Sequence, residues 1–333
     1  MSIVVSHRTA RAFHQLPLPL GDLRRFPLEP APLKTGAPCA CSIAYARAAL
    51  QRSGPAEEAL ENLEVIVSKP SERRVMPGIT CHLLGGELPA RTLLEIEKGV
   101  LVPDVRLCAL GAASYLSLRE LIEYYFELCG TYALFPGGNE SYRKLKTART
   151  TTEDLRAFFL AMRQRNHAAK ALRALRYVRD GSRSPMETAT VMLLVLSMRE
   201  GGLGIRSVTM NHEIPVTKAA RKLTRRKTLI CDAFIARCLL DIEYNGILHE
   251  QTDQRIIDAE RLNALHAMGY EMLVIDRSAL FSVLSFRRLM ASIERHAHIK
   301  QRYLNEAFRI RQEELRTFVL RNCRKPDDSP STP

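Results

Sequence analysis

Apolar and polar residues alternate most regularly in the stretch Lys227–Tyr270, which predicts the core of one domain. Residues 227–235 are rich in β-forming side chains, and residues 238–244 alternate between apolar and polar positions. Both patterns are typical of short strands. Ala236 and Arg237 lie between the two segments, so we expect a two-residue turn and a β-hairpin.

The predicted hairpin gathers acidic residues on one face. A two-residue turn places Asp232 opposite Asp241, and residues two apart in a strand share a face. Asp241, Glu243 and Asn245 therefore lie on one face, together with Asp232. Clustered carboxylates repel one another unless a cation lies among them, and a divalent metal ion is the usual cation. The hairpin thus predicts a metal site.

The chain after the hairpin completes a sheet. His249 precedes a run with an apolar stripe, which predicts a helix over residues 252–268. Gly269 suits the C-terminal cap of that helix, and residues 270–275 are typical of a buried strand. A hairpin, a crossover helix and a further strand form a mixed sheet flanked by helices, which is an α/β core within an α+β chain.

This order of residues resembles the restriction-endonuclease-like PD-(D/E)XK superfamily, and within it the branch of very-short-patch-repair endonucleases. The resemblance is carried by Asp232, Glu243-Tyr244-Asn245, His249, Asp258-Ala259-Glu260-Arg261 and Gly269-Tyr270. The first helix of the superfamily usually carries a Glu. Ser184-Pro185-Met186-Glu187 predicts a helix start, with Glu187 at that position. The resemblance covers about residues 184–285.

The resemblance implies a Mg²⁺ or Mn²⁺ ion held by Asp232 and Glu243. Glu187, Asp241 and the side-chain oxygen of Asn245 are further candidate ligands. Such an ion lowers the pKa of a bound water and stabilises charge on a phosphate. Glu187 has an alternative role as the carboxylate of a capping box, where it would serve the backbone amides of its own helix.

Two positions depart from the pattern of the superfamily. Asn245 stands where the superfamily has a Lys, and Cys231 stands where it has a Pro. An Asn oxygen can bind a metal ion, but it adds no charge and cannot activate water. His249 is then the candidate for general base or for positioning the water. Its alternative role is that of a structural His at the end of a strand.

A basic run lies immediately before the acidic hairpin. Its six cations are Lys218, Arg221, Lys222, Arg225, Arg226 and Lys227. Such a run can hold a nucleic-acid backbone while a metal ion reaches one phosphate. The alternative is a solvated loop that binds nothing.

Composition suits a nucleic-acid partner and argues against a membrane protein. The chain has 333 residues and a formal net charge of +13, which favours binding to phosphates. No run reaches the roughly 18 apolar residues of a membrane helix, and we find no signal peptide. Eight cysteines in a chain without secretory features indicate reduced thiols, so we expect a cytoplasmic protein.

The first half of the chain predicts an α+β domain without a catalytic motif. Strands are expected over residues 63–67, 79–84 and 92–102, and helices over residues 105–116 and 118–129. A Pro-rich stretch over residues 16–40 is typical of an extended connection.

The segment Glu127–Tyr132 is similar to one in bacterial proteins that carry a comparable nuclease-like C-terminus, and some of these are described as antitoxin-like regulators. This similarity implies a second hypothesis beside a DNA endonuclease. The nuclease fold would be catalytically inactive and would bind DNA or a protein partner, and a homodimer is also open. Asn245 favours the second hypothesis, whereas Asp232, Glu243 and His249 favour the first.

These patterns predict an organisation in five parts. We expect an N-terminal α+β domain over residues 1–150, a helical connection over 151–183 and a restriction-endonuclease-like domain over 184–300. A C-terminal helix over residues 301–324 and a disordered tail over 325–333 follow.

Overall fold

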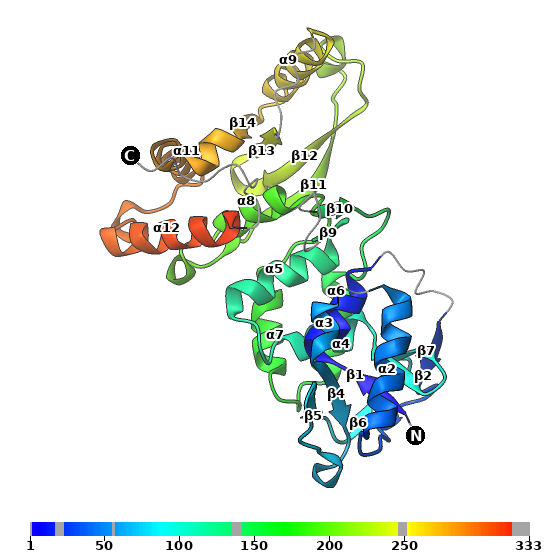
Figure 1. Ribbon diagram of the computed structural model, residues 1–333. Coiled ribbons are helices and arrows are strands. Elements are labelled where there is room, and N and C mark those ends of the chain that lie inside the picture. Colours follow the sequence, from blue (N-terminus) through cyan, green and yellow to red (C-terminus); the bar gives the residue numbers. More distant parts are fainter. Residues whose placement is uncertain (1, 17–22, 55–56, 135–141, 246–251, 322–333) are drawn as a thin grey trace. The chain divides into compact units, whose positions relative to one another are not determined.

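The computed structural model has an α+β fold, as predicted, and divides into two compact units (Figure 1). Unit 1 comprises Met1–Leu128 and Arg149–Arg176, and unit 2 comprises Cys129–Ala148 and Tyr177–Pro333. The structure describes residues 2–16, 23–54, 57–134, 142–245 and 252–321, without the side chains of residues 245 and 252–257.

Unit 1 is built on a six-stranded sheet with the strand order β2-β7-β8-β1-β4-β5. These strands are β1 (Ile3–Val5), β2 (Arg24–Phe26), β4 (Leu63–Val67), β5 (Ile79–Leu83), β7 (Leu93–Glu97) and β8 (Val100–Pro103). A separate short pair consists of β3 (Ala31–Pro32) and β6 (Glu87–Leu88). The helices are α1 (His7–His14), α2 (Ala40–Ser53), α3 (Glu58–Glu61), α4 (Val105–Ala112), α5 (Leu118–Cys129), α6 (Thr152–Ala161) and α7 (Ala168–Leu175).

Unit 2 is built on a four-stranded mixed sheet with the strand order β11-β12-β13-β14. Its strands are β11 (Val208–Pro215), β12 (Thr228–Ile235), β13 (Leu240–Asn245) and β14 (Glu271–Asp276), and a separate hairpin consists of β9 (Tyr132–Leu134) and β10 (Tyr142–Lys144). The helices are α8 (Pro185–Val195), α9 (Thr252–Ala267), α10 (Arg277–Phe281), α11 (Val283–His296) and α12 (Glu306–Leu320).

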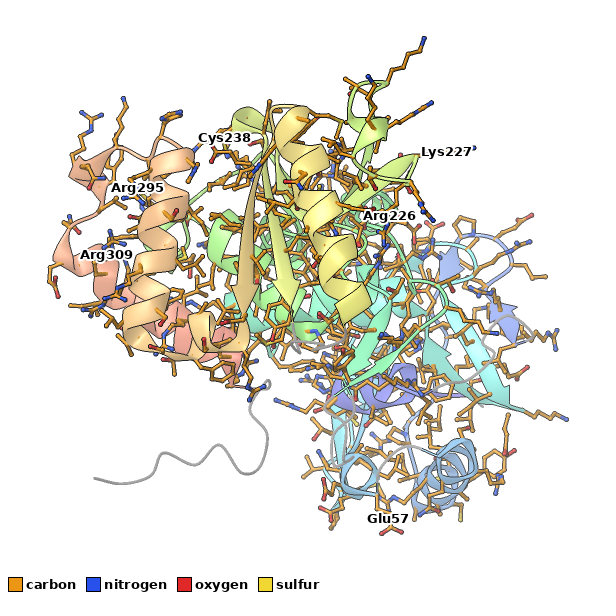
Figure 2. The ribbon with its side chains drawn as sticks, turned by 90° about the horizontal axis from the view of Figure 1, so that it is seen from above. Glu57, Arg226, Lys227, Cys238, Arg295 and Arg309 are labelled. Atoms are coloured by element: carbon orange, nitrogen blue, oxygen red, sulfur yellow. The ribbon has the colours of Figure 1, made fainter. Side chains whose placement is uncertain are left out.

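The strand directions in unit 2 follow the predicted order. β11, β12 and β13 are antiparallel neighbours, and β14 runs parallel to β13. Parallel neighbours need a crossover connection, and α9 provides it. In Figure 2, α9 is the yellow helix that lies over the strands. The predicted mixed sheet with helices packed on it is therefore confirmed.

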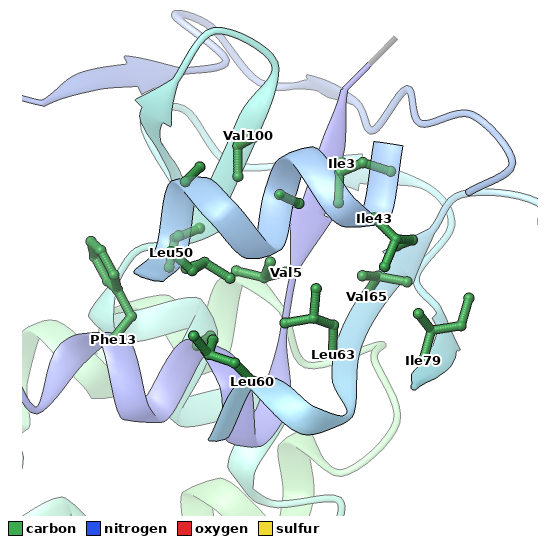
Figure 3. Close-up of a cluster of buried hydrophobic side chains, with 14 of the residues drawn as sticks. Ile3, Val5, Phe13, Ile43, Leu50, Leu60, Leu63, Val65, Ile79 and Val100 are labelled. Carbon is green, nitrogen blue, oxygen red and sulfur yellow. The ribbon is translucent and has the colours of Figure 1, made fainter. Parts of the chain in front are cut away.

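Each unit has its own hydrophobic core. In unit 1, side chains such as Val5, Phe13 and Leu63 are packed between the sheet and its helices (Figure 3). In unit 2, Leu265 of α9 packs with Phe234 of β12 and with further apolar side chains of the sheet. Full burial of a large apolar side chain stabilises a fold by about 1.5–3 kcal/mol, so these clusters hold each sheet to its helices.

The turn of the acidic hairpin differs from the prediction. Phe234, not Asp232, lies opposite Asp241. The connection is a 3₁₀ turn over Ala236–Cys238 followed by Leu239 at φ +50°. The predicted two-residue turn was wrong, because the connection between the strands also includes Leu239 in a left-handed conformation. The alternation of apolar and polar residues gives no signal for such a conformation.

The division into units also differs from the predicted boundaries. Helices α6 and α7, which we expected in a connection over residues 151–183, belong to unit 1. The segment Cys129–Ala148, expected in the N-terminal domain, belongs to unit 2. The C-terminal helix is α12, preceded by a 3₁₀ turn over Gln301–Tyr303, and the tail over residues 325–333 lies outside the described residues.

No helix in the described part of the chain has both the length and the apolar character that a membrane span requires.

Candidate functional site

Asp232 interrupts the regular alternation of β12. Cys231 and Phe234 are three residues apart, yet both enter the core cluster beside α9. The residues of β11 and β12 are paired on both sides of Asn211 and Asp232, but these two residues are not paired. Asn211 has φ +49°. Its side-chain amide donates a hydrogen bond to the carbonyl of Gly181 at 2.6 Å. Irregularities of this kind redirect side chains and are frequent beside functional sites.

The side chains of Asp232 and Glu243 each bond to the opposite strand where β12 and β13 separate. The regular ladder reaches Ala233 opposite Ile242. Beyond that pair, the backbone N–H of Asp232 donates to Oε1 of Glu243 at 3.3 Å, and the backbone N–H of Tyr244 donates to Oδ2 of Asp232 at 3.0 Å. Side-chain carboxylates thus accept the hydrogen bonds that backbone carbonyls of the neighbouring strand accept in a regular sheet. The predicted site residues Asp232 and Glu243 are brought together in this way.

The cation among these carboxylates is Arg261 of α9. Its guanidinium donates to Oδ2 of Asp241 at 3.1 Å, to Oε1 of Glu243 and to the carbonyl of Ile230. Asp241 is 0% exposed, so this partner compensates a fully buried charge. The sequence predicted that a cation lies among the carboxylates, and an Arg from the helix motif supplies at least part of that charge.

Burial raises the pKa values of the hairpin carboxylates. Burial, followed by the negative charges of Asp241 and Asp232, raises the pKa of Glu243 to about 8. Burial likewise raises the pKa values of Asp241 and Asp232. If all three carboxylates ionise, the single positive charge of Arg261 leaves them with a net negative charge. The arrangement therefore favours either a retained proton or a further cation.

Glu187 serves the start of α8. The Oγ of Ser184 accepts from the backbone N–H of Glu187 at 3.2 Å and donates to Oε1 of Glu187 at 3.1 Å. Oε2 of Glu187 accepts from the backbone N–H of Arg183 at 2.8 Å. The alternative role as a capping carboxylate is thus present. Burial raises the pKa of Glu187 to about 7, and the charge of Asp232 adds to the effect, so Glu187 also borders the acidic site.

The described residues of the acidic site do not form a tight cage of ligands. Among the described residues, the group of His, Cys, Asp or Glu ligand atoms that lie within 4.8 Å of one another consists of His7, Glu64 and His82 in unit 1. The predicted ligands Glu187, Asp232, Asp241 and Glu243 do not form such a group. Mg²⁺ usually takes only one or two carboxylates from a protein and keeps several waters. The pair Asp232 and Glu243 satisfies that smaller requirement.

Two predicted site residues cannot be located at the level of side chains. Asn245 ends β13 opposite Asp276 of β14, and its side chain lies outside the described residues. His249 lies wholly outside them. The roles predicted for Asn245 as a ligand and for His249 as a base therefore stay predictions.

The basic run forms the connection between β11 and β12. All six of its cationic side chains are exposed, and none forms an ion pair within the described part of the chain. Buried Ala220 and Thr224 anchor the connection, and Ala220 joins the core cluster beside α9. Figure 2 shows Arg226 and Lys227 on this connection. The run is available to a polyanion, and it leads directly into the strand that carries Asp232.

The His7, Glu64 and His82 group was not predicted from the sequence. A weak signal was present, because Glu64 lies within the apolar segment 63–67 and is buried in β4.

Comparison of the chain with protein-family models, curated proteins and solved structures finds no match.

Proposed function

We propose that unit 2 is a nuclease domain of the PD-(D/E)XK type, which hydrolyses DNA phosphodiester bonds with Mg²⁺ or Mn²⁺ in the cytoplasm. The observation that carries the proposal is the pair of cross-strand hydrogen bonds by which the Glu243 carboxylate accepts from the backbone N–H of Asp232 and the Asp232 carboxylate accepts from that of Tyr244. The succession of α8, the hairpin of β12 and β13, α9 and the parallel strand β14 supports it, because the resemblance implies this order.

The residues of the site fit a divalent ion. Asp232 and Glu243 would hold the ion, which would lower the pKa of a bound water and stabilise charge on the phosphate. Burial and the charges of Asp241 and Asp232 raise the pKa of Glu243, and a bound cation would favour its ionised form. Arg261 contributes by fixing Asp241 and Glu243 in one orientation through its hydrogen bonds.

The surface charge supports a nucleic acid as the substrate. The exposed run Lys218–Lys227 carries six cations without acidic partners among the described residues. Phosphate contacts of this kind position a nucleic acid without reading its sequence. A metal site that begins five residues after the run would then act on the bound backbone, which is the arrangement that endonucleolytic cleavage requires.

The experiment is a plasmid-nicking assay with the full chain. Supercoiled DNA is incubated with Mg²⁺, with Mn²⁺ or with a chelator, and nicked product is followed over time. We expect metal-dependent nicking that Asp232→Asn and Glu243→Gln abolish. Glu213→Gln is the matched control, because Glu213 is an exposed carboxylate on the neighbouring strand β11. Nicking that survives Glu243→Gln would exclude this site as its source.

A second candidate function is a catalytically inactive nuclease fold that binds DNA or a protein partner as an antitoxin-like regulator. The contact of Arg261 with both Asp241 and Glu243 favours it, because this cation compensates charge without a metal. Asn245 in place of a Lys favours it as well. This function predicts DNA binding that a chelator leaves unchanged, together with no nicking under any metal condition.

A further inference from the structure

Three side chains in unit 1 meet at the start of α1. His7 opens α1, Glu64 lies on β4 and His82 lies on β5. The backbone N–H of Ser6 donates to the carbonyl of Glu64 at 2.7 Å, which sets His7 beside β4. β5 is parallel to β4, with His82 opposite Ile66. One ligand atom from each of the three residues lies within 4.8 Å of the other two.

Two ring nitrogens of this group have no hydrogen-bond partner among the residues that the structure describes. Nδ1 of His7 and Nε2 of His82 are both buried and unpaired. Nε2 of His82 lies 3.7 Å from Oε2 of Glu64. Buried polar atoms are nearly always paired in folded proteins. Two unpaired ring nitrogens beside a buried carboxylate are the donor atoms that a shared cation needs.

The carboxylate of the group is held in one orientation. The backbone N–H of Arg8 donates to Oε2 of Glu64 at 2.9 Å, and the Arg8 guanidinium donates to Oε1 at 2.9 Å. Metal-binding carboxylates are typically fixed by such outer hydrogen bonds. A metal ion binds the neutral form of imidazole.

The group borders a cavity and lies on strained backbone. His7 and His82 line a cavity of about 730 Å³, together with Ser114, Arg165 and His167. His7 has φ +45°, a conformation that costs a non-glycine residue stability and that is concentrated at functional sites. The cavity leaves room for a water or a small ligand beside the three side chains.

We propose that His7, Glu64 and His82 bind a divalent transition-metal ion of the Zn²⁺ class, with one coordination position open to the cavity. Two imidazoles and one carboxylate are a ligand set of catalytic zinc sites. Mg²⁺ prefers oxygen ligands and is not expected here. The two rings stack with centroids 3.6 Å apart and planes at 22°. Metal binding therefore turns at least one ring out of the stack, so that both nitrogens point at the ion.

The first test is metal uptake by the full chain after removal of metals with a chelator. Exposed Cys39 and Cys41 are replaced by Ser in this parent protein, because thiols also bind zinc. Zn²⁺ binding is measured by calorimetry, and Co²⁺ serves as a spectroscopic substitute. We expect one ion per chain to show the visible absorption bands of a tetrahedral Co²⁺ site. A parent protein without these bands overturns the proposal.

Variants then locate the site. His82→Asn is expected to weaken binding at least 100-fold, and Arg8→Ala about 10–100-fold through the lost outer hydrogen bond. His167→Asn is the matched control: His167 lines the same cavity outside the ligand group, and Asn tolerates its φ of +68°. Equal binding by His82→Asn and His167→Asn overturns the assignment.

A measurement on the parent protein keeps the test decisive if His82→Asn fails to fold. Bound Zn²⁺ protects its imidazole ligands from acylation by diethyl pyrocarbonate, and mass spectrometry locates the modified residues. We expect Zn²⁺ to slow the modification of His7 and His82 and to leave that of His298 unchanged. His298 lies in unit 2, outside the ligand group. Equal modification rates with and without Zn²⁺ overturn the proposal.

Discussion

At the scale of single residues, Arg261 has the largest expected effect on stability in the acidic site. It contacts Asp241 and Glu243, and both carboxylates are buried. Removal of one partner from a buried ion pair leaves an uncompensated charge and costs about 3–5 kcal/mol. Arg261→Ala should therefore lower the free energy of unfolding by about this amount in urea denaturation above the pKa of Glu243.

The matched control for this change is Arg226→Ala. Arg226 is exposed and has no ion pair in the described part of the chain, so its loss should change stability by less than about 0.5 kcal/mol. Equal losses in the two variants would contradict the view that Arg261 compensates buried carboxylates.

Glu243 should give the stability of unit 2 a characteristic dependence on pH. Its pKa is raised from 4.5 to about 8 in the folded protein. Between these two values the folded state holds a proton that the unfolded state has released, so the free energy of unfolding falls as pH rises. Glu243→Gln should flatten this fall across the window, as measured by urea denaturation at several pH values.

Two other carboxylates bear on this measurement. Glu187, whose pKa is raised to about 7, should leave a smaller residual slope at the lower end of the window in Glu243→Gln. Glu213→Gln should keep the slope of the parent protein, because Glu213 is exposed on β11. A parent protein and a Glu243→Gln variant with parallel pH profiles would refute the assignment.

The sequence identified some of these residues and misjudged the geometry of others. Asp232, Glu243 and Arg261 were found because carboxylate spacing and the order of motifs are local properties of the chain. The position of Asp232 was argued from strict alternation, and that argument failed. Asn211 adopts a positive φ on the neighbouring strand, and neither Asn211 nor Asp232 is paired in the ladder between β11 and β12, although the register is the same on both sides of them. Such a dependence on a neighbouring strand leaves no periodic signal.

At the scale of elements, length decided what could be predicted. Helix α9 and strand β12 lie close to their expected bounds, because each is long enough to show a hydrophobic period. β1, β2 and β9 have three residues each and were missed. Strands this short are defined by the neighbours that they pair with rather than by their own composition.

The connection between β11 and β12 carries the prediction on DNA binding. If its cations contact phosphates, each contact contributes about 0.9 to the slope of log affinity against log salt on duplex DNA. Arg225→Ala combined with Arg226→Ala should reduce that slope by about 1.8 and weaken binding to all sequences alike. Fluorescence anisotropy across a series of salt concentrations measures the slope.

The matched control for this pair is Arg287→Ala combined with Arg288→Ala. These two residues form an exposed cationic pair on α11, outside the connection between β11 and β12. The control should keep the slope of the parent protein. If both double variants bind DNA with an unchanged slope, the basic run is a solvated loop and does not contact phosphates.

At the scale of the whole molecule, the segment Cys129–Ala148 should be necessary for the stability of unit 2. The backbone N–H of Thr131 donates to the carbonyl of Ser182 at 2.7 Å, and the hydroxyls of Tyr132 and Thr188 are 2.9 Å apart. A fragment of residues 177–333 lacks these contacts and the buried Tyr132 ring. We expect it to melt at a lower temperature than residues 129–333 with Arg149–Arg176 replaced by a short Gly-Ser linker. Equal melting temperatures in calorimetry would show that the segment is dispensable.

The two units alternate along the chain, and this constrains the order in which the segments of each unit are synthesised on the ribosome. Unit 1 lacks α6 and α7 until the codon for Arg176 has been read, whereas β9 and β10 emerge earlier and belong to unit 2. Domains generally fold as units from the N-terminus during synthesis. Here a nascent chain must complete unit 1 while the β9–β10 hairpin still awaits α8 and the sheet of unit 2. A translational pause before Arg176 would therefore expose two unfinished cores at once.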